Sequence, residues 1–128
     1  MAREHVVGFD HVSLPMQHTD EMVAFYRALG FDVAARAAVV SVYAGAQMVN
    51  FHRPELWPRA GFTLRAPAAV PPCGDLCFVW EGTADALPAY LERAGAVIEE
   101  GPSRARAVAA HRRRACTYAT PTATSWSS

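Results

Sequence analysis

The chain has 128 residues, 52% of them hydrophobic, and a formal net charge of zero. This length suffices for one domain whose core buries roughly two thirds of the surface of the unfolded chain. No apolar run approaches the about 20 residues that span a bilayer, and the N-terminus does not lead into a signal-peptide core. We therefore expect a cytoplasmic protein that does not bind membranes.

The first half of the chain predicts a strand, a helix and three further strands. The first strand is expected at 9–14, where apolar residues surround His11. In the helix that follows, Thr19 is a suitable N-cap, apolar residues recur at helical spacing, and Gly30 provides the C-terminal cap. The three further strands are expected at 31–33, 39–43 and 48–52.

The second half repeats this order after an irregular segment, 53–72, that contains five prolines. A strand is expected at 75–80, a helix at 85–94, and another strand beginning at 96–98. The halves align at an offset of 64 to 65 residues, which places Gly30 on Gly95 and His11 on Asp75. Such a repeat predicts an α+β fold of two βαβββ units. The expected bounds are 7–53 for unit one, 54–73 for a connector and 74–128 for unit two.

The three cysteines are an odd number, which does not suggest a disulfide framework. Cys73 and Cys77 have a C-x3-C spacing that differs from the usual zinc pairs. We expect Cys73 to be a loop thiol and Cys77 a buried strand residue, with a metal-binding pair as the alternative.

Two histidines, His11 and His52, lie in apolar strand segments 41 residues apart. A histidine in such a strand is either a hydrogen-bonded core residue or a metal ligand. Trp57 and Phe62, in the proline-rich segment, either line a pocket or anchor a loop.

Several segments in this order resemble the vicinal oxygen chelate superfamily, which includes glyoxalase I, extradiol dioxygenases and the fosfomycin- and bleomycin-resistance proteins. The matching text is D-H-V-S-L at 10–14, A-F-Y-R-A-L-G-F at 24–31, M-V-N-F-H at 48–52, G-D-L-C-F at 74–78 and I-E-E-G-P at 98–102. The chain is most similar to single-domain glyoxalase-like proteins. The resemblance implies two βαβββ units whose curved, partly open mixed sheet surrounds one divalent metal ion.

The resemblance also implies the ligands, one from the first and one from the last strand of each unit. Carried over by position, these are His11 and His52 in unit one and Asp75 in unit two. The ion would be Fe, Mn, Ni, Co or Zn, and it would polarise a carbonyl and stabilise the enediolate formed from a substrate with vicinal oxygens. The resemblance further implies a homodimer. It identifies no catalytic base, because the usual candidate is a glutamate that this chain lacks.

The tail departs from the family. Residues 103–128 contain no Asp or Glu, and the expected segment Y-x-x-D-P-D-G-N-x-x-E is absent. Translated one frame over, however, the codons of Cys116–Ser127 can spell V-Y-V-R-D-P-D-G-N-L-V-E, so the tail is interpretable as an out-of-frame ending. As written, Ser127 stands where the closing glutamate ligand is expected.

Three functions are therefore considered. The first is a metal-dependent lyase, isomerase or dioxygenase, impaired by the missing glutamate. The second is a metal-free binding protein like the bleomycin-resistance proteins, and the third is a non-functional product whose C-terminal strands do not form. The arginines at 112–114 could form a nucleic-acid patch, but no aromatic residues are interleaved with them, so no nucleic-acid partner is expected.

Overall fold

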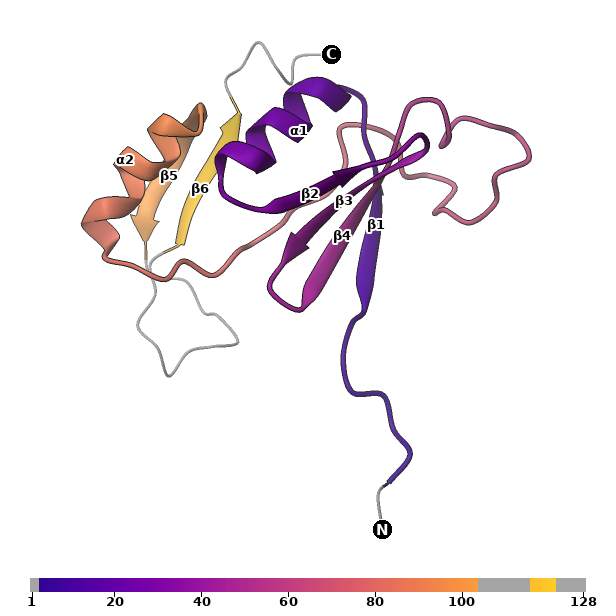
Figure 1. The fold of residues 1–128 in the computed structure, drawn as a ribbon, viewed down its shortest axis with the longest axis horizontal. Coiled ribbons are helices and arrows are strands. Elements are labelled where there is room, and N and C mark those ends of the chain that lie inside the picture. The colour runs from indigo at the N-terminus through magenta and orange to yellow at the C-terminus, as the bar shows by residue number, and fades with distance from the viewer. Residues whose placement is uncertain (1–2, 104–115, 122–128) are drawn as a thin grey trace.

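The structure, a computed structural model, describes residues 3–103 and 116–121 and has an α+β architecture. Its main sheet contains β1 (His11–Pro15), β2 (Asp32–Ala35), β3 (Val39–Ala44) and β4 (Gln47–His52). The spatial order is β1-β4-β3-β2, with β1 parallel to β4 and the other neighbours antiparallel. The open mixed sheet and the order strand, helix, three strands agree with the prediction for unit one (Figure 1).

Helix α1 (Thr19–Ala28) connects β1 to β2. The predicted N-cap is wrong by one residue, because Thr19 is already helical and His18 is the N-cap, without a side-chain capping hydrogen bond. Asp20 and Glu21 occupy the first turn, where their negative charges interact favourably with the positive end of the helix dipole. Beyond the C-cap Leu29, Gly30 has φ +93, a left-handed conformation that favours glycine, so the predicted end of the helix is confirmed.

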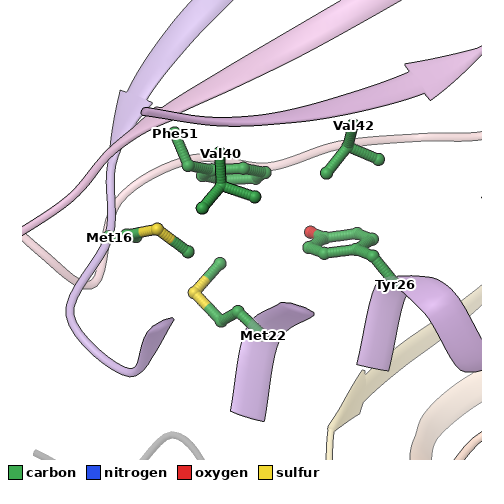
Figure 2. Close-up of a cluster of buried hydrophobic side chains, with 6 residues drawn as sticks. All are labelled: Met16, Met22, Tyr26, Val40, Val42 and Phe51. Carbon is green, nitrogen blue, oxygen red and sulfur yellow. The ribbon is translucent and has the colours of Figure 1, made fainter. Parts of the chain in front are cut away.

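The core lies between α1 and the face of the sheet that α1 covers (Figure 2). Its buried members are Met16, Met22, Tyr26, Val40, Val42 and Phe51. The ring of Tyr26 stacks on that of Phe51 with centroids 5.5 Å apart. Burial also raises the pKa of the Tyr26 phenol to about 12. The helical spacing of the apolar residues in α1 therefore gives the core one side and the alternation within β3 and β4 gives it the other.

The second half contains a 3-10 turn, η1 (Ala84–Ala86), followed by α2 (Leu87–Arg93). Two antiparallel strands then form a separate sheet, β5 (Ala96–Ser103) and β6 (Cys116–Pro121). The predicted helix and the strand after it are confirmed. The formation of β6 also differs from the expectation, under the third function, that the C-terminal strands do not form.

The predicted strand at 75–80 is wrong, because these residues have no strand assignment. Leu76 packs instead against the core of the first half, and the ring of Phe78 lies 4.8 Å from that of Phe31. Cys77, between them, is exposed and not buried as expected. A short run of apolar residues predicts a buried strand, but a strand also needs a neighbour to complete its hydrogen bonds. The two-unit βαβββ arrangement therefore stays a prediction.

The second half contacts the first through Leu76 and Phe78 and also through Tyr90 of α2, a helix on the far side of the molecule from β1 (Figure 1). The Tyr90 hydroxyl donates a hydrogen bond to the carbonyl oxygen of Leu29, at the end of α1. A Cβ atom at Gly30 would lie 3.1 Å from the same hydroxyl. Gly30 therefore ends the helix and also leaves room for this contact between the halves.

None of the helices in the described part of the chain is long and apolar enough to cross a membrane. The arginines at 112–114 and Ser127 lie outside the described residues.

Candidate functional site

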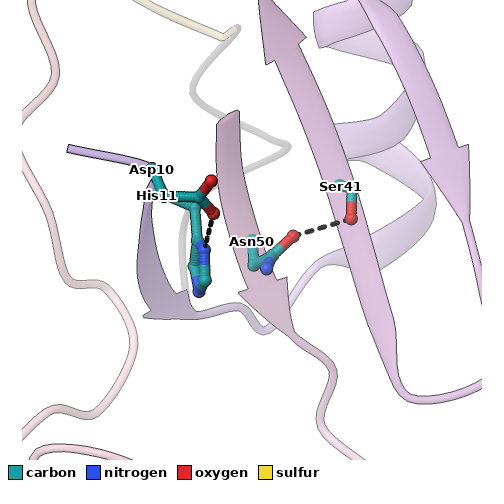
Figure 3. A network of polar contacts seen from close by, with 4 residues as sticks. All are labelled: Asp10, His11, Ser41 and Asn50. Atoms are coloured by element: carbon teal, nitrogen blue, oxygen red, sulfur yellow. Dashed lines mark hydrogen bonds and ion pairs between the residues drawn. The ribbon is translucent and has the colours of Figure 1, made fainter. Parts of the chain in front are cut away.

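The pairing of β1 with β4 places the two predicted histidine ligands on one face of the sheet. His11 lies opposite Met48 and Pro15 lies opposite His52. Side chains two residues apart in a strand share a face, so His11 and His52 lie together on the face opposite Phe51 and the core. We call this side of β1, β4 and β3 the polar face; it bears His11, Ser13, Ser41, Asn50 and His52. Figure 3 shows three of these residues, His11, Ser41 and Asn50. The register separates the two histidines by four strand positions, about 13 Å at the usual rise per residue.

The imidazole of His11 is held by its neighbour in the chain. Its Nδ1 lies 2.7 Å from a carboxylate oxygen of Asp10 (Figure 3). A carboxylate accepts hydrogen bonds, so Nδ1 is the donor and the lone pair of the neutral ring lies on Nε2. A histidine that donates to a carboxylate with one nitrogen and presents the other is the usual arrangement of a metal ligand or a general base. Both residues are exposed, so this nitrogen is accessible.

His52, at the end of β4, is 8% exposed. The Phe62 ring stands at 90° to its imidazole with centroids 5.1 Å apart. Burial, and then the positive charge of Arg65, lower the pKa of His52 below its ordinary value. The ring is therefore neutral at neutral pH, which is the form that binds a metal ion or accepts a hydrogen bond.

The lowered pKa of His52 predicts that the stability of the protein depends on pH. In the unfolded chain His52 titrates near 6.5, whereas the folded chain holds a lower pKa. The unfolded state therefore binds more protons below about pH 6.5, and the free energy of unfolding falls as the pH drops through this range. Urea denaturation at pH 7.5 and 5.5, with a chelator present, should show a smaller loss of stability on acidification in His52→Gln than in the wild type. An equal loss in both would contradict the shift, and His18→Gln serves as the matched control.

The proline-rich segment 53–72 covers the His52 end of the polar face. The Trp57 indole donates a hydrogen bond of 2.9 Å to the carbonyl oxygen of Met16, just beyond β1. The Arg65 guanidinium lies over the Trp57 ring, 5.7 Å from its centroid, and also donates to the carbonyl oxygen of Ala69 at 2.9 Å. The sequence left open whether Trp57 and Phe62 line a pocket or anchor a loop. In the structure Trp57 anchors this loop, and Phe62 contacts His52.

The third predicted ligand, Asp75, is exposed. It follows Gly74, where an added Cβ would lie 2.6 Å from the side chain of Leu14. Leu14 packs against the core, on the other side of β1 from His11. Within residues 3–103 and 116–121, no three His, Cys, Asp or Glu side chains come together as a metal-binding group. The complete ligand set therefore stays a prediction.

The structure adds Ser41 and Asn50, which the sequence analysis did not select. They lie opposite each other in β3 and β4, and the Ser41 hydroxyl donates a hydrogen bond of 2.6 Å to Asn50 Oδ1 (Figure 3). The signal in the sequence is one polar residue at the centre of each apolar strand, V-V-S-V-Y and M-V-N-F-H. Alternation alone would have placed Asn50 on the same face as His52.

Neither family models nor curated proteins match this chain. Solved structures do. An integron cassette protein from the mobile metagenome of V. cholerae is 22% identical, with a TM-score of 0.70 over 91% of this chain and 86% of its own. A second such structure, from V. pseudocholerae, is also 22% identical, with a TM-score of 0.70 over 92% and 87%. A virulence protein from Salmonella typhimurium is 25% identical, with a TM-score of 0.69 over 83% and 82%. These likenesses support the fold and name no activity.

Proposed function

We propose that this chain is a glyoxalase-like protein of the vicinal oxygen chelate type, in which the polar face holds a divalent metal ion. Its activity would be that of a lyase, isomerase or dioxygenase on a small molecule with adjacent oxygens. The observation that supports this most is the sequence resemblance at 10–14 and 48–52, the segments that contain His11 and His52. The register of β1 against β4 places these two residues on one face of the sheet, four strand positions apart.

Each of the two histidines has the chemistry of a metal ligand, but the register of β1 against β4 holds them four strand positions apart, wider than two imidazoles on one ion span. His11 has Nδ1 held by Asp10 and presents Nε2, whereas burial lowers the pKa of His52 and so favours its neutral ring. Two imidazoles suit Fe, Mn, Ni, Co or Zn, with oxygen ligands completing the coordination. When bound, such an ion polarises a carbonyl oxygen and stabilises negative charge that develops on the substrate. Asp75 remains the third candidate ligand by position in the sequence.

The sequence of the tail, residues 103–128, affects the expected metal affinity of this site. Ser127 occupies the position of the expected glutamate, and a serine hydroxyl does not replace a carboxylate as a ligand. We therefore propose that the chain as written binds metal weakly and that its activity is impaired.

Metal titration tests the proposal. In isothermal titration calorimetry with Zn²⁺, Ni²⁺, Co²⁺ or Mn²⁺, the wild type should take up about one ion per chain. His11→Ala and His52→Ala should each weaken binding by more than the about 10- to 100-fold that follows loss of an outer-shell partner, because each removes a ligand. His5→Ala, in the N-terminal segment, is the control. Unchanged metal content in both variants, with circular dichroism like that of the wild type, would refute a metal site at these histidines.

A metal-free binding protein is the second candidate function. The proline-rich segment 53–72 beside His52 favours this function. Its Phe62, Trp57 and Arg65 side chains are two aromatic rings and a guanidinium, groups that bind aromatic ligands. Ligand binding that persists in excess chelator would support this function over the enzyme.

The second βαβββ unit and the homodimer are also proposed on the resemblance. In the described residues β1 has a strand neighbour on one side only, and Val6, Val7 and Phe9 before it are exposed. An open strand edge with exposed apolar residues is a common place of association between chains. The cytoplasmic location stays a prediction.

A further inference from the structure

We propose that the groove between α1 and the end of β2 binds a small zwitterion, an α-amino acid with an apolar side chain, through Asp20, Arg27 and Arg53. This groove has a volume of about 280 Å³ and lies on the side of the sheet that α1 covers, opposite the polar face. The inference therefore concerns a second site and does not rest on the proposed function.

The walls of the groove come from three parts of the chain. Helix α1 packs beside β2 (Figure 1). Ala35, the last residue of β2, lies opposite the buried Val40, so its side chain is on the α1 side of the strand. Arg53 follows β4, where its backbone N–H donates to the carbonyl oxygen of Ala38 and its Nη1 donates to that of Arg36. These hydrogen bonds hold the Arg53 guanidinium at one end of the groove.

One face of α1 forms the other wall. Residues at the helical spacing i, i+3, i+4 and i+7 line the groove, namely Asp20, Val23, Ala24 and Arg27. Asp20 lies in the first turn and Arg27 in the last, about 10 Å apart along the axis at the usual rise per residue. This wall therefore has a carboxylate toward one end, a guanidinium toward the other, and small apolar side chains between them.

The charged groups of the groove have unused hydrogen-bonding capacity. Within residues 3–103 and 116–121, the Asp20 carboxylate makes no hydrogen bond or ion pair. Arg27 donates a single long hydrogen bond, of 3.5 Å, to the carbonyl oxygen of Val33. The Nε of Arg53 is buried without a hydrogen-bond acceptor, because the nearest carboxylate oxygen, that of Glu55, is 3.7 Å away. Both guanidiniums therefore have donors left for the anionic group of a ligand.

The balance of these groups indicates the kind of ligand. Two guanidiniums and one carboxylate line the groove, so a ligand carboxylate pairs with Arg27 and Arg53 while a ligand ammonium pairs with Asp20. The apolar side chain of the ligand then lies against Val23 and Ala35. A volume of about 280 Å³ is below the range of about 300–1,000 Å³ that is typical for drug-sized molecules, which agrees with a ligand as small as one amino acid.

An NMR titration of the isotope-labelled full chain with L-leucine, in the presence of a chelator, tests the site. Amide signals in α1 and around Ala35 and Arg53 should shift, and those of β1 should not. Arg27→Gln should weaken leucine binding about tenfold or more, as expected for a lost hydrogen bond between charged groups. Glu21→Gln, which also removes a carboxylate from the first turn of α1, is the matched control and should bind leucine like the wild type.

A second ligand separates the role of Asp20 from a folding defect. N-acetyl-leucine has the carboxylate and the side chain but no ammonium group, so it should bind the wild type more weakly than leucine does. Asp20→Asn should weaken leucine binding about tenfold or more and leave N-acetyl-leucine binding unchanged. A variant that had lost its fold would bind neither ligand.

Three results would overturn the inference. They are the absence of leucine-induced shifts in the wild type, shifts confined to the polar face, and equal leucine affinity in the wild type, Asp20→Asn and Arg27→Gln. Because the chelator removes metal ions, none of these results depends on whether the polar face holds a metal.

Discussion

Tyr26→Ala is expected to lower the free energy of unfolding by about 3–5 kcal/mol, the usual loss when a large aromatic core residue is truncated. Tyr26 is 7% exposed and its ring lies against the rings of Phe25, Phe31, Phe51 and Phe78, with centroid separations from 5.4 to 6.5 Å. Because small domains have total stabilities of about 5–15 kcal/mol, such a loss would leave much of the protein unfolded. Urea denaturation followed by circular dichroism measures it.

Two variants make this test specific. Tyr26→Phe keeps the ring and its packing, so it should stay within about 1 kcal/mol of the wild type. Tyr43→Ala is the matched truncation on β3, where the side chain is 37% exposed, and it should also cost about 1 kcal/mol or less. If Tyr26→Ala were no more destabilising than Tyr43→Ala, the core assigned between α1 and the sheet would be wrong.

Translation of the tail one frame over, from Pro102 onward, is expected to give the largest gain in metal affinity. Where the codons spell D-P-D-G-N-L-V-E in the other frame, the alternative ending supplies the carboxylate that Ser127 cannot. A direct ligand should contribute more than the about 10- to 100-fold that outer-shell partners contribute to metal affinity. Calorimetric metal titration of the two chains side by side measures the difference.

The same chain with its closing glutamate replaced by glutamine is the control, because it has the new tail without the new charge. Equal metal affinity in the chain with the glutamate and in this control would show that the carboxylate is not a ligand. The gene provides an independent check, since a base sequence that cannot spell D-P-D-G-N-x-x-E in the other frame would end the out-of-frame interpretation.

The sequence predicted most elements of the first unit because their signals are local. The apolar positions of α1 recur every three to four residues, and Gly30 ends the helix because it adopts a left-handed φ of +93. The N-cap was misplaced by one residue because His18 and Thr19 differ in backbone conformation and not in any repeating pattern. The exact first residue of a helix depends on where the chain turns, and the packing of neighbouring segments determines that turn.

The segment 75–80 shows the limit of pattern alone. Its run of apolar residues, L-C-F-V-W at 76–80, predicted a strand, and Leu76 and Phe78 do contact the core. A strand also requires a hydrogen-bonded neighbour, and an apolar run contains no information about which segment that neighbour is. The exposure of Cys77 has the same origin, because it lies between two residues that face the core.

For the candidate site, the sequence by itself determined which residues have useful chemistry and, through the two-residue period of a strand, which of them share a face. Only the tertiary structure decided that β1 is parallel to β4, with His11 opposite Met48 and Asn50 between the levels of the two histidines. The pairing of these strands joins residues 37 positions apart in the chain, and its register depends on how both strands pack against α1. A shift by one residue would turn His52 toward the core and Phe51 toward solvent, so burial of the apolar face fixes the register and, with it, the site.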